Sequence, residues 1–267
     1  MDWLSAEPLL RIALPGLLFI LMAFWECRRP ARELTGHQRY RWCHNLLLVT
    51  LNSLLVRLLM PVLPVTVALY AAHEQSGVFH LLDLPYAVSL IAGLVLLDLT
   101  LYLQHRLFHR VPALWRLHRM HHADQDVDVS TGLRFHPLEI LLSLLIKMLV
   151  VWLLGVPAEA VIAFEVLLSA MAVFNHANVN LPQPYERWLR CLVVTPDMHR
   201  IHHSADVLET HTNFGFNLSC WDRWLGSYCK DARSPLRIGV CGLTAPREQR
   251  LDKMLTQPFR QIKSGSQ

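Results

Sequence analysis

The segment Tyr86–His122, YAVSLIAGLVLLDLTLYLQHRLFHRVPALWRLHRMHH, decides how the rest of the chain is interpreted. Its first part, Tyr86–Gln104, is almost entirely apolar, and about 20 apolar residues are enough to cross a bilayer as a helix. Two histidine-rich strings follow directly, HRLFH at His105–His109 and HRMHH at His118–His122. The segment therefore predicts a membrane span that ends at a cluster of imidazoles.

The whole chain of 267 residues has the same character. It is 53% hydrophobic and 17% charged, whereas soluble domains are typically about 25% charged. Histidine occurs 15 times, and the net charge of +4 is clustered beside apolar runs, a pattern that disfavours nucleic acid as a partner. The six cysteines form no CxxC pair and support neither a zinc ribbon nor a disulfide framework. This composition indicates a membrane protein that holds metal.

Four further apolar stretches complete the predicted bundle: Leu9–Trp25, Leu46–Ala71, Leu138–Leu154 and Ala158–Phe174. The second stretch contains Pro61 and Pro64, so we expect a broken helix or a short re-entrant hairpin there. Only three residues separate the last two stretches, which predicts a tight helical hairpin. The expected fold is all-α, a multi-pass transmembrane helical bundle of about four to five spans.

The distribution of Lys and Arg predicts the orientation, because cytoplasmic loops retain positive charge. Residues 27–45 and 105–136 hold five Arg each, and residues 180–267 hold twelve Lys and Arg. The connections 72–85 and 155–157 hold none. We therefore expect the N-terminus and both connections without Lys or Arg outside, and a cytoplasmic helical cap that carries the histidines as a di-metal site.

Composition divides the chain into three regions. Residues 1–85 form an N-terminal transmembrane region, residues 86–240 carry the histidine strings, and residues 241–267 form a polar C-terminal tail. We expect the tail to be peripheral or disordered. The part from 180 to 240 is expected to fold as the cap on the helix ends.

A third string, HRIHH at His199–His203, follows a helix start formed by Thr195, Pro196 and Asp197. Positions i, i+3 and i+4 share one face of a helix, so each string is expected to point its imidazoles in a single direction. Eight imidazoles exceed the four ligands of a tetrahedral zinc and suit two metal ions. They are His105, His109, His118, His121, His122, His199, His202 and His203.

Three more histidines need separate interpretations. His176 lies at the end of an apolar stretch, level with the strings, and is a ninth candidate ligand. His136 precedes Pro137, where a role in starting the helix competes equally with ligation. His211 is expected to support the site or the fold rather than bind metal. Imidazole serves Fe, Zn, Cu and Ni, so the ligand type alone leaves the metal open.

Acidic residues are expected to support the ligands, because a ligating imidazole needs its second N–H held by an acceptor. The candidates are Asp98, Glu139, Asp197 and Asp222. Asp98 is the strongest of them, since it shares a helix stripe with His105 and His109.

Two charges interrupt the last two apolar stretches. Lys147 and Glu165 lie at about the same depth, given a rise of about 1.5 Å per residue. Charges inside a membrane are costly unless they are paired or face a polar cavity. We therefore expect an ion pair, or a cavity wall that contacts substrate.

The ordered set of motifs resembles the fatty acid hydroxylase and sterol desaturase superfamily. Besides the three strings, the set includes LRFHPLE at 133–139, FNHANV at 174–179 and NFGFNLSCWDRWLGSY at 213–228. The resemblance covers roughly residues 90–230. It implies that residues 86–240 form the catalytic region of an integral-membrane, non-haem di-iron oxidoreductase that hydroxylates or desaturates a sterol-like or fatty acyl lipid.

The resemblance also implies roles for individual residues. It places metal ligands at His105, His109, His118, His121, His122, His176, His199, His202 and His203. It gives Trp221, Asp222 and Gly226 a structural role. The chain departs from the family at His211, where an Asp or Asn is expected.

The implied cofactors are two Fe ions and O2, with Zn able to replace Fe in overexpressed protein. No GxGxxG occurs and no haem-binding or flavin domain is recognisable, so electrons are expected from a separate reductase or electron carrier. The expected partners are the membrane and a lipid substrate, with no nucleic acid. The expected location is a bacterial inner membrane rather than the endoplasmic reticulum, with the metal site on the cytoplasmic side.

Alternative functions remain open on sequence alone. One is a histidine-rich membrane protein that binds or transports metal, although transport would place ligands along a path through the spans. Another is an alkylglycerol-type ether-lipid monooxygenase within the same superfamily. A zinc hydrolase is disfavoured because no HExxH occurs and every string lacks a general-base Glu.

Overall fold

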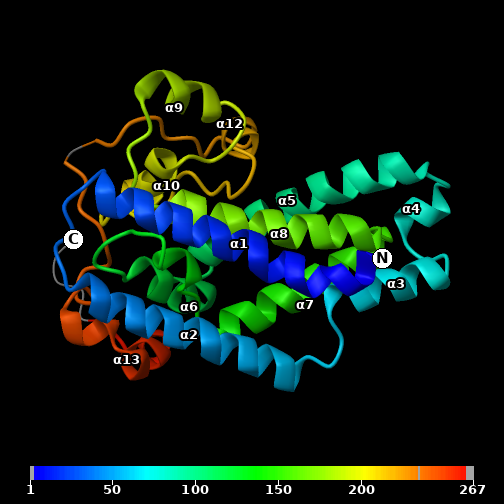
Figure 1. The fold of residues 1–267 in the computed structure, drawn as a ribbon, viewed down its shortest axis with the longest axis horizontal. Helices are drawn as coiled ribbons and strands as arrows, with labels where there is room; N and C mark the ends of the chain where they lie inside the picture. The colour runs from blue at the N-terminus through cyan, green and yellow to red at the C-terminus, as the bar shows by residue number, and fades with distance from the viewer. Residues whose placement is uncertain (1–2, 234, 263–267) are drawn as a thin grey trace.

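The computed structural model describes residues 3–233 and 235–262, with side chains from residue 12 onward. Within these residues the regular structure is helical, with three isolated bridges and no strand. The long helices are α1 (Trp3–Arg28), α2 (Gln38–Leu59), α3 (Pro64–His73), α5 (Tyr86–Arg110), α7 (Pro137–Leu154) and α8 (Ala158–His176). They run along the long axis of the molecule (Figure 1). The all-α prediction is confirmed.

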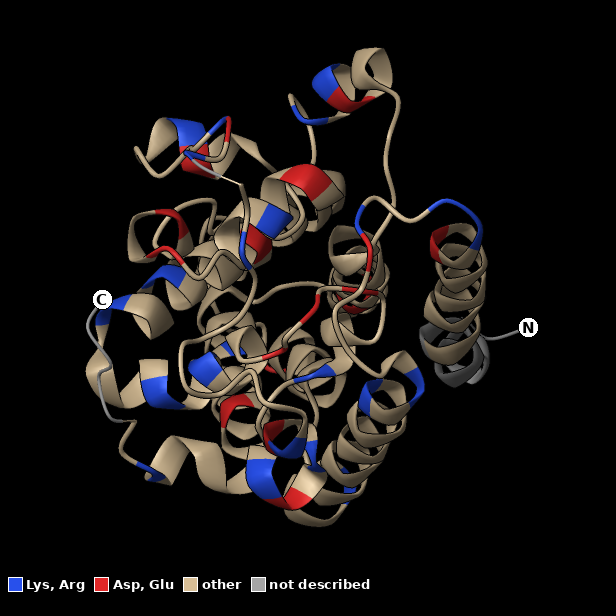
Figure 2. Ribbon diagram, turned by 90° about the vertical axis from the view of Figure 1, so that its left-hand side faces the viewer, with Lys and Arg blue, Asp and Glu red and all other residues tan. Residues whose placement is uncertain are grey.

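Most of the shorter helices form a cap at one end of the long ones, on the left in Figure 1. They are α6 (Pro112–His122), α9 (Gln183–Leu189), α10 (Pro196–His202), α11 (Val207–Thr210), α12 (Cys220–Trp224) and α13 (Leu251–Thr256), with 3-10 turns at Thr131–Leu133, Pro246–Gln249 and Gln257–Phe259. Figure 2 views the molecule from this end and shows acidic and basic residues spread over the cap. Proline starts α6, α7 and α10, where its missing N–H costs nothing.

Four stretches of the described residues are long and apolar enough to cross a membrane: Gln38–Leu81, Tyr86–Arg110, Pro137–Leu154 and Ala158–His176. The first contains the expected break, because α2 ends at Leu59 and α3 begins at Pro64. Large apolar side chains such as Leu58 and Ile91 are exposed on these helices, as lipid-facing residues would be. The predicted span Leu9–Trp25 lies in α1, partly outside the described side chains, and stays a prediction.

The two connections that hold no Lys or Arg, 72–85 and 155–157, meet at the end opposite the cap. Gly155 ends α7 in the left-handed conformation, with φ of 70°, and this allows the tight turn into α8. A Cβ atom added to Gly77 would lie 2.3 Å from the backbone nitrogen of Gly155. Glycine is therefore required where residues 72–85, which include α4 (Val78–Leu81), pack on this turn.

The C-terminal segment differs from the expected peripheral tail. Met254 in α13 is fully buried against Leu48 and Met120. The backbone oxygen of Gln257 accepts a hydrogen bond from Arg119 at 2.6 Å. The segment packs on the cap although its composition is polar, because the apolar side chains at positions 251, 254 and 255 are spaced so that they form one face of the helix. Residues 263–267 lie outside the described residues.

A buried ion cluster anchors the cap to α2. Arg41 is fully buried; its Nε lies 2.6 Å from Asp124 and its Nη1 lies 2.8 Å from Asp128. Burial alone would raise the pKa of Asp124, but the guanidinium groups of Arg41 and Arg134 outweigh it and lower this pKa to about 2. Arg41 is thus an internal cation rather than an exposed loop charge, and it fixes the loop that follows the HRMHH string.

The substitution Arg41→Met leaves the buried carboxylates without their cation. We expect the free energy of unfolding to fall by about 3–5 kcal/mol, because removing one partner strands a buried charge. Thermal unfolding of the purified protein in detergent measures the loss. Arg39→Met, at an exposed position two residues earlier, is the matched control. Equal losses in the two variants would contradict an anchoring role for Arg41.

Candidate metal centre

Nine histidines come together where the bundle meets the cap, and they form two groups. The first group is His105, His109, His118, His122 and His202, and the second is His121, His176, His199 and His203. Within each group, one ring nitrogen of every member lies within 4.8 Å of those of the others. All nine side chains are buried. The structure thus brings together the nine histidines that the sequence motifs singled out.

Each HxxHH string is divided between the groups. The first and last histidines of a string, four positions apart, enter one group, and the middle histidine enters the other. The middle residue is His121 in α6 and His202 in α10. Successive helical residues differ in direction by about 100°, so adjacent histidines can face different groups. This corrects the expectation that each string points all its imidazoles one way.

In five of the nine histidines, Nδ1 is the outer ring nitrogen, the one that points away from the group, and it lies against an acceptor that is fixed in the fold. Four acceptors are backbone oxygens: Phe214 for His105 at 2.8 Å, Arg134 for His121 at 3.0 Å, Ala172 for His176 at 2.6 Å and Thr212 for His202 at 2.7 Å. The fifth is Glu139, whose Oε1 lies 2.6 Å from Nδ1 of His118. An Nδ1–H that donates outward leaves the Nε2 lone pair facing inward for a metal.

The inner nitrogens have spacings that suit shared ions. In the first group, Nε2 of His105 and Nε2 of His118 are 3.0 Å apart. In the second, Nε2 of His176 lies 3.0–3.2 Å from Nε2 of His199, His121 and His203. Two imidazole nitrogens bound to one ion at about 2.1 Å would be about 3.0–3.4 Å apart. Both groups therefore fit a metal ion.

Burial keeps these imidazoles in the form that binds metal. Desolvation and neighbouring imidazoles lower the pKa of His122, His199 and His203 well below the ordinary value, and burial lowers that of His202 to about 3. The neutral ring is the ligating form. Both ring nitrogens of His109 and His122 are buried without a hydrogen-bond partner in the described part of the chain. Such groups are costly unless something else binds them.

The predicted supporting carboxylates have different contacts. Glu139 holds His118, as expected. Asp98 instead accepts a hydrogen bond from Nε1 of Trp221 at 2.7 Å, and Asp197 pairs with Arg200 at 2.6 Å. Helix spacing places Asp98 on the same face as the ligands, but the segment packed beside it decides which donor it meets. Among the described contacts, neither Asp98 nor Asp197 touches a ligand imidazole.

Asp222 acts on the site through the backbone. Its carboxylate accepts hydrogen bonds from the N–H groups of Phe214 at 2.7 Å and Gly215 at 2.8 Å, and from the Ser227 hydroxyl at 2.7 Å. Burial raises the pKa of Asp222 to about 6. Because the carbonyl of Phe214 is the acceptor for His105, Asp222 is a positioning residue for that ligand.

His136 and His211, for which the sequence left a role at the site open, lie outside both groups. His136 occupies the N-cap of α7, where its Nδ1 accepts from the N–H of Leu138 at 3.2 Å, and its Nε2 lies 3.2 Å from the oxygen of Leu255. The structure therefore places His136 at a helix start and not among the candidate ligands. His211 is exposed, with its ring centroid 5.4 Å from that of His109.

Sequence reasoning missed the residues that surround the rings. Arg134 was counted only as a loop charge, yet it is fully buried and donates to the carbonyl of Met120 at 2.9 Å. Phe135 stacks on His121 with centroids 4.4 Å apart. Arg134 and Phe135 could have been found from the LRF triplet at 133–135, which directly precedes His136. The backbone carbonyls that accept from the histidines could not be found from sequence, because every residue has a backbone carbonyl.

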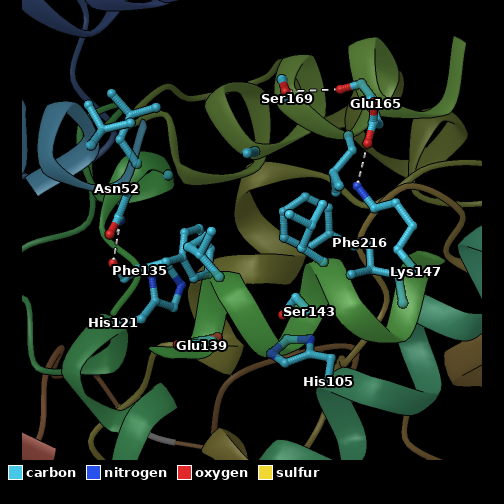
Figure 3. A pocket seen from close by; sticks show the side chains of 18 of the residues that line it. Asn52, His105, His121, Phe135, Glu139, Ser143, Lys147, Glu165, Ser169 and Phe216 are labelled. Atoms are coloured by element: carbon cyan, nitrogen blue, oxygen red, sulfur yellow. Dashed lines mark hydrogen bonds and ion pairs between the residues drawn. The ribbon is translucent and has the colours of Figure 1, made fainter. Parts of the chain in front are cut away.

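A cavity of about 700 Å³ runs from the histidines into the bundle (Figure 3). His105, His118, His121 and His199 form part of its wall, and most of the remaining wall is apolar. Lys147 and Glu165 also line it, with Nζ and Oε1 2.9 Å apart, so the predicted ion pair is present. The candidate metal centre thus opens onto a space suited to a lipid.

Comparisons with known proteins agree with this architecture. The chain is 32% identical over 176 residues to an ornithine lipid hydroxylase of Rhizobium tropici, which is 66% of this chain and 51% of that protein. It is 27% identical over 181 residues to an alkylglycerol monooxygenase of Xenopus tropicalis, covering 63% and 36%. It is 28% identical over 228 residues to a human cholesterol 25-hydroxylase, covering 80% and 78%.

The chain thus spans about half of the first relative and about a third of the second. No solved structure is significantly similar. The family model for fatty acid hydroxylase matches residues 90–227, which contain all nine grouped histidines and the Asp222 segment. Together with the membrane-length helices and the two histidine groups, this match shows that the chain belongs to the fatty acid hydroxylase family.

Proposed function

We propose that this chain is a membrane-bound oxidoreductase that uses O2 and two electrons to hydroxylate a C–H position of a lipid at a centre of two iron ions. The observation that carries the proposal is the junction of nine buried imidazoles, in two groups, with a largely apolar cavity. The named activities of the three relatives support a lipid substrate. Desaturation of the same position is the alternative outcome.

The chemistry of the ligands supports iron rather than a hydrolytic zinc. Imidazole binds both metals, but both groups consist of imidazoles alone, and the nearby carboxylate of Glu139 holds Nδ1 of His118. Attack on an alkyl C–H bond needs an oxidant made from O2 at a redox-active metal, which iron supplies when bound. The metal-transport alternative loses support because the ligands gather at one end of the bundle, in α6, in and just after α10, and at the C-terminal ends of α5 and α8. Figure 1 shows α6 and α10 at that end.

The residues of the chain orient and isolate the reaction. Glu139 and the four backbone carbonyls hold the outer ring nitrogens of five histidines, so these five imidazoles stay aimed inward without rearranging. Phe108, Phe135 and Phe216 line the cavity near the histidines and keep water away from the reacting carbon. Electrons come from a separate reductase or electron carrier that meets the cap.

The cavity wall supports access for the lipid from the bilayer. Part of the wall comes from α1, at Pro15, Gly16 and Phe19, and part from α2, which contributes Val49, Asn52, Ser53 and Val56. A Cβ atom added at Gly16 would meet nothing within 4 Å. A sterol-like, fatty acyl or ether lipid can therefore slide between α1 and α2 without leaving the membrane.

The charge pattern supports the orientation that we propose. The cap carries the Arg-rich segments, and the connections without Lys or Arg meet at the other end. We therefore assign the cap and the metal centre to the cytoplasmic side of a bacterial inner membrane. We propose the nine grouped histidines as the metal ligands, and His136 is not one of them.

The function is tested by metal analysis and lipid analysis of the same protein. We expect about two irons per chain when iron is supplied, and a new hydroxylated lipid in cells that make the protein. His121→Ala should abolish the product and lower the metal content, whereas His37→Ala, at an exposed position, should change neither. A single tightly held zinc together with an unchanged lipid profile would overturn the proposal.

The contact between Glu139 and His118 sets the metal affinity of the first group. We expect Glu139→Ala to weaken metal binding by about 10–100-fold, the range seen when such a partner is lost, and Glu139→Gln to fall between. Competition with a graded chelator measures the affinity. Glu33→Ala, at an exposed position, is the control. An unchanged affinity in Glu139→Ala would show that the hydrogen bond is incidental.

If the lipid enters the cavity from the bilayer between α1 and α2, a large side chain at position 16 should hinder its entry. Gly16→Trp should block the space between α1 and α2 and reduce lipid turnover at least about ten-fold, with metal content unchanged. Ile20→Trp places the same side chain on an exposed position one turn away and should keep activity. Product formation in reconstituted vesicles measures both variants. Full activity of Gly16→Trp would exclude this path.

A further inference from the structure

Polar side chains form a stripe along the wall of the cavity in α7. Between Pro137 and Leu154, only Glu139, Ser143 and Lys147 carry charged or hydroxyl groups. The three residues are spaced by four positions, so they share one face of the helix, and all three line the cavity. The polar groups of this membrane-spanning helix are therefore directed at whatever the cavity holds.

α8 presents a matching stripe. Glu165 and Ser169 are four positions apart and line the same cavity. Figure 3 shows Lys147 reaching from α7 toward Glu165, with Ser143 on the same side of α7. On α5, Gln104 also lines the cavity and donates to the Ser143 hydroxyl at 2.7 Å. Polar groups from three helices thus converge on one part of a largely apolar space.

Stability does not account for this arrangement. An ion pair buried in apolar surroundings is often no better than well-packed apolar residues, because desolvation offsets the attraction. Lys147 and Glu165 keep 18% and 12% of their side-chain surface exposed, although they lie in the middle of membrane-length helices. Lys147 has three N–H donors, of which Glu165 takes one, so it can serve a further acceptor in the cavity.

We propose that Lys147 and Glu165, with Ser143 and Gln104, form a subsite for an uncharged hydrogen-bonding group of the lipid, a hydroxyl or a carbonyl. A hydroxyl can accept from the ammonium and donate to the carboxylate, which leaves the ion pair intact. A lipid carboxylate would have to displace Glu165 from Lys147, and a lipid ammonium would be repelled by Lys147. The pair as a whole is neutral, and it suits a neutral partner.

The position of the subsite defines the class of substrate. Lys147 is eight residues beyond Glu139 on the same helix, which corresponds to about 12 Å along the axis. Glu139 contacts the candidate ligand His118. The substrate is therefore an amphiphile whose hydroxyl or carbonyl lies about 12 Å from the carbon that reaches the metal centre. This inference rests on the proposed function in so far as it calls the bound lipid a substrate. Binding of the lipid at the subsite does not depend on that function.

Matched lipid pairs test the subsite directly. Cholestanol and 5α-cholestane differ only in one hydroxyl, as do 1-hexadecanol and hexadecane. Binding to the metal-loaded protein in nanodiscs is measured by competition with a fluorescent lipid. We expect the intact protein to favour the hydroxylated member of at least one pair by about ten-fold or more, as a hydrogen bond to a charged group provides. Lys147→Met should reduce that preference to near unity.

Two further variants keep the test decisive if Lys147→Met folds poorly. The double variant Lys147→Met/Glu165→Leu removes both charges together, so no unpaired charge stays buried, and it should also lose the preference. Leu145→Met, at an exposed position of the same helix, should retain it. Equal binding of both members of each pair, absence of binding, or a preference that survives the double variant would overturn the subsite.

The two proposals fail separately. Lipid hydroxylation by an intact protein without any hydroxyl preference would leave the function standing and remove the subsite. A hydroxyl preference in a protein that holds no iron and oxidises no lipid would leave the subsite standing and remove the proposed function.

Discussion

Five of the nine grouped histidines donate from an outer ring nitrogen to an acceptor that is fixed in the fold, and the geometry of both groups depends on these hydrogen bonds. Four of the five acceptors are backbone carbonyls, at residues 134, 172, 212 and 214. A buried imidazole that is cut off from water is stabilised when a protein group accepts from its second nitrogen. For His105, His121, His176 and His202, the direction of the inner nitrogen is therefore set by the path of the main chain.

Buried charges hold that main chain in place. Arg41 and Asp124 fix the loop that leads from the HRMHH string to residue 134. Asp222 gathers the N–H groups of residues 214 and 215, and Asp98 secures the segment of Asp222 through Trp221. These charged groups do not touch the candidate ligands themselves. They act indirectly. A carboxylate that accepts from backbone N–H groups positions a whole segment, and the carbonyl to which an imidazole donates is positioned with it.

The two ends of the histidine site face different surroundings. Toward the bundle lies a largely apolar cavity with a narrow polar stripe, and toward the cap lies a second, smaller pocket of about 350 Å³ lined by Arg106, Arg110 and His211 as well as His109. The first suits a lipid tail or ring. The second is open to polar solutes. The grouped histidines thus lie between a largely apolar cavity and a smaller pocket with a polar lining.

The sequence by itself determined the helical class, the membrane-length spans apart from α1, and the identity of the nine grouped histidines, since apolar length and HxxHH spacing are local properties. It also predicted the pair of Lys147 and Glu165, because helix rise alone placed them at one depth. Only the tertiary structure decided how the strings divide between two groups, that His136 caps α7, that Asp98 meets Trp221, and that Met254 packs into the cap. These outcomes depend on which segment lies beside a given helix face, and spacing along one helix carries no information about its neighbours.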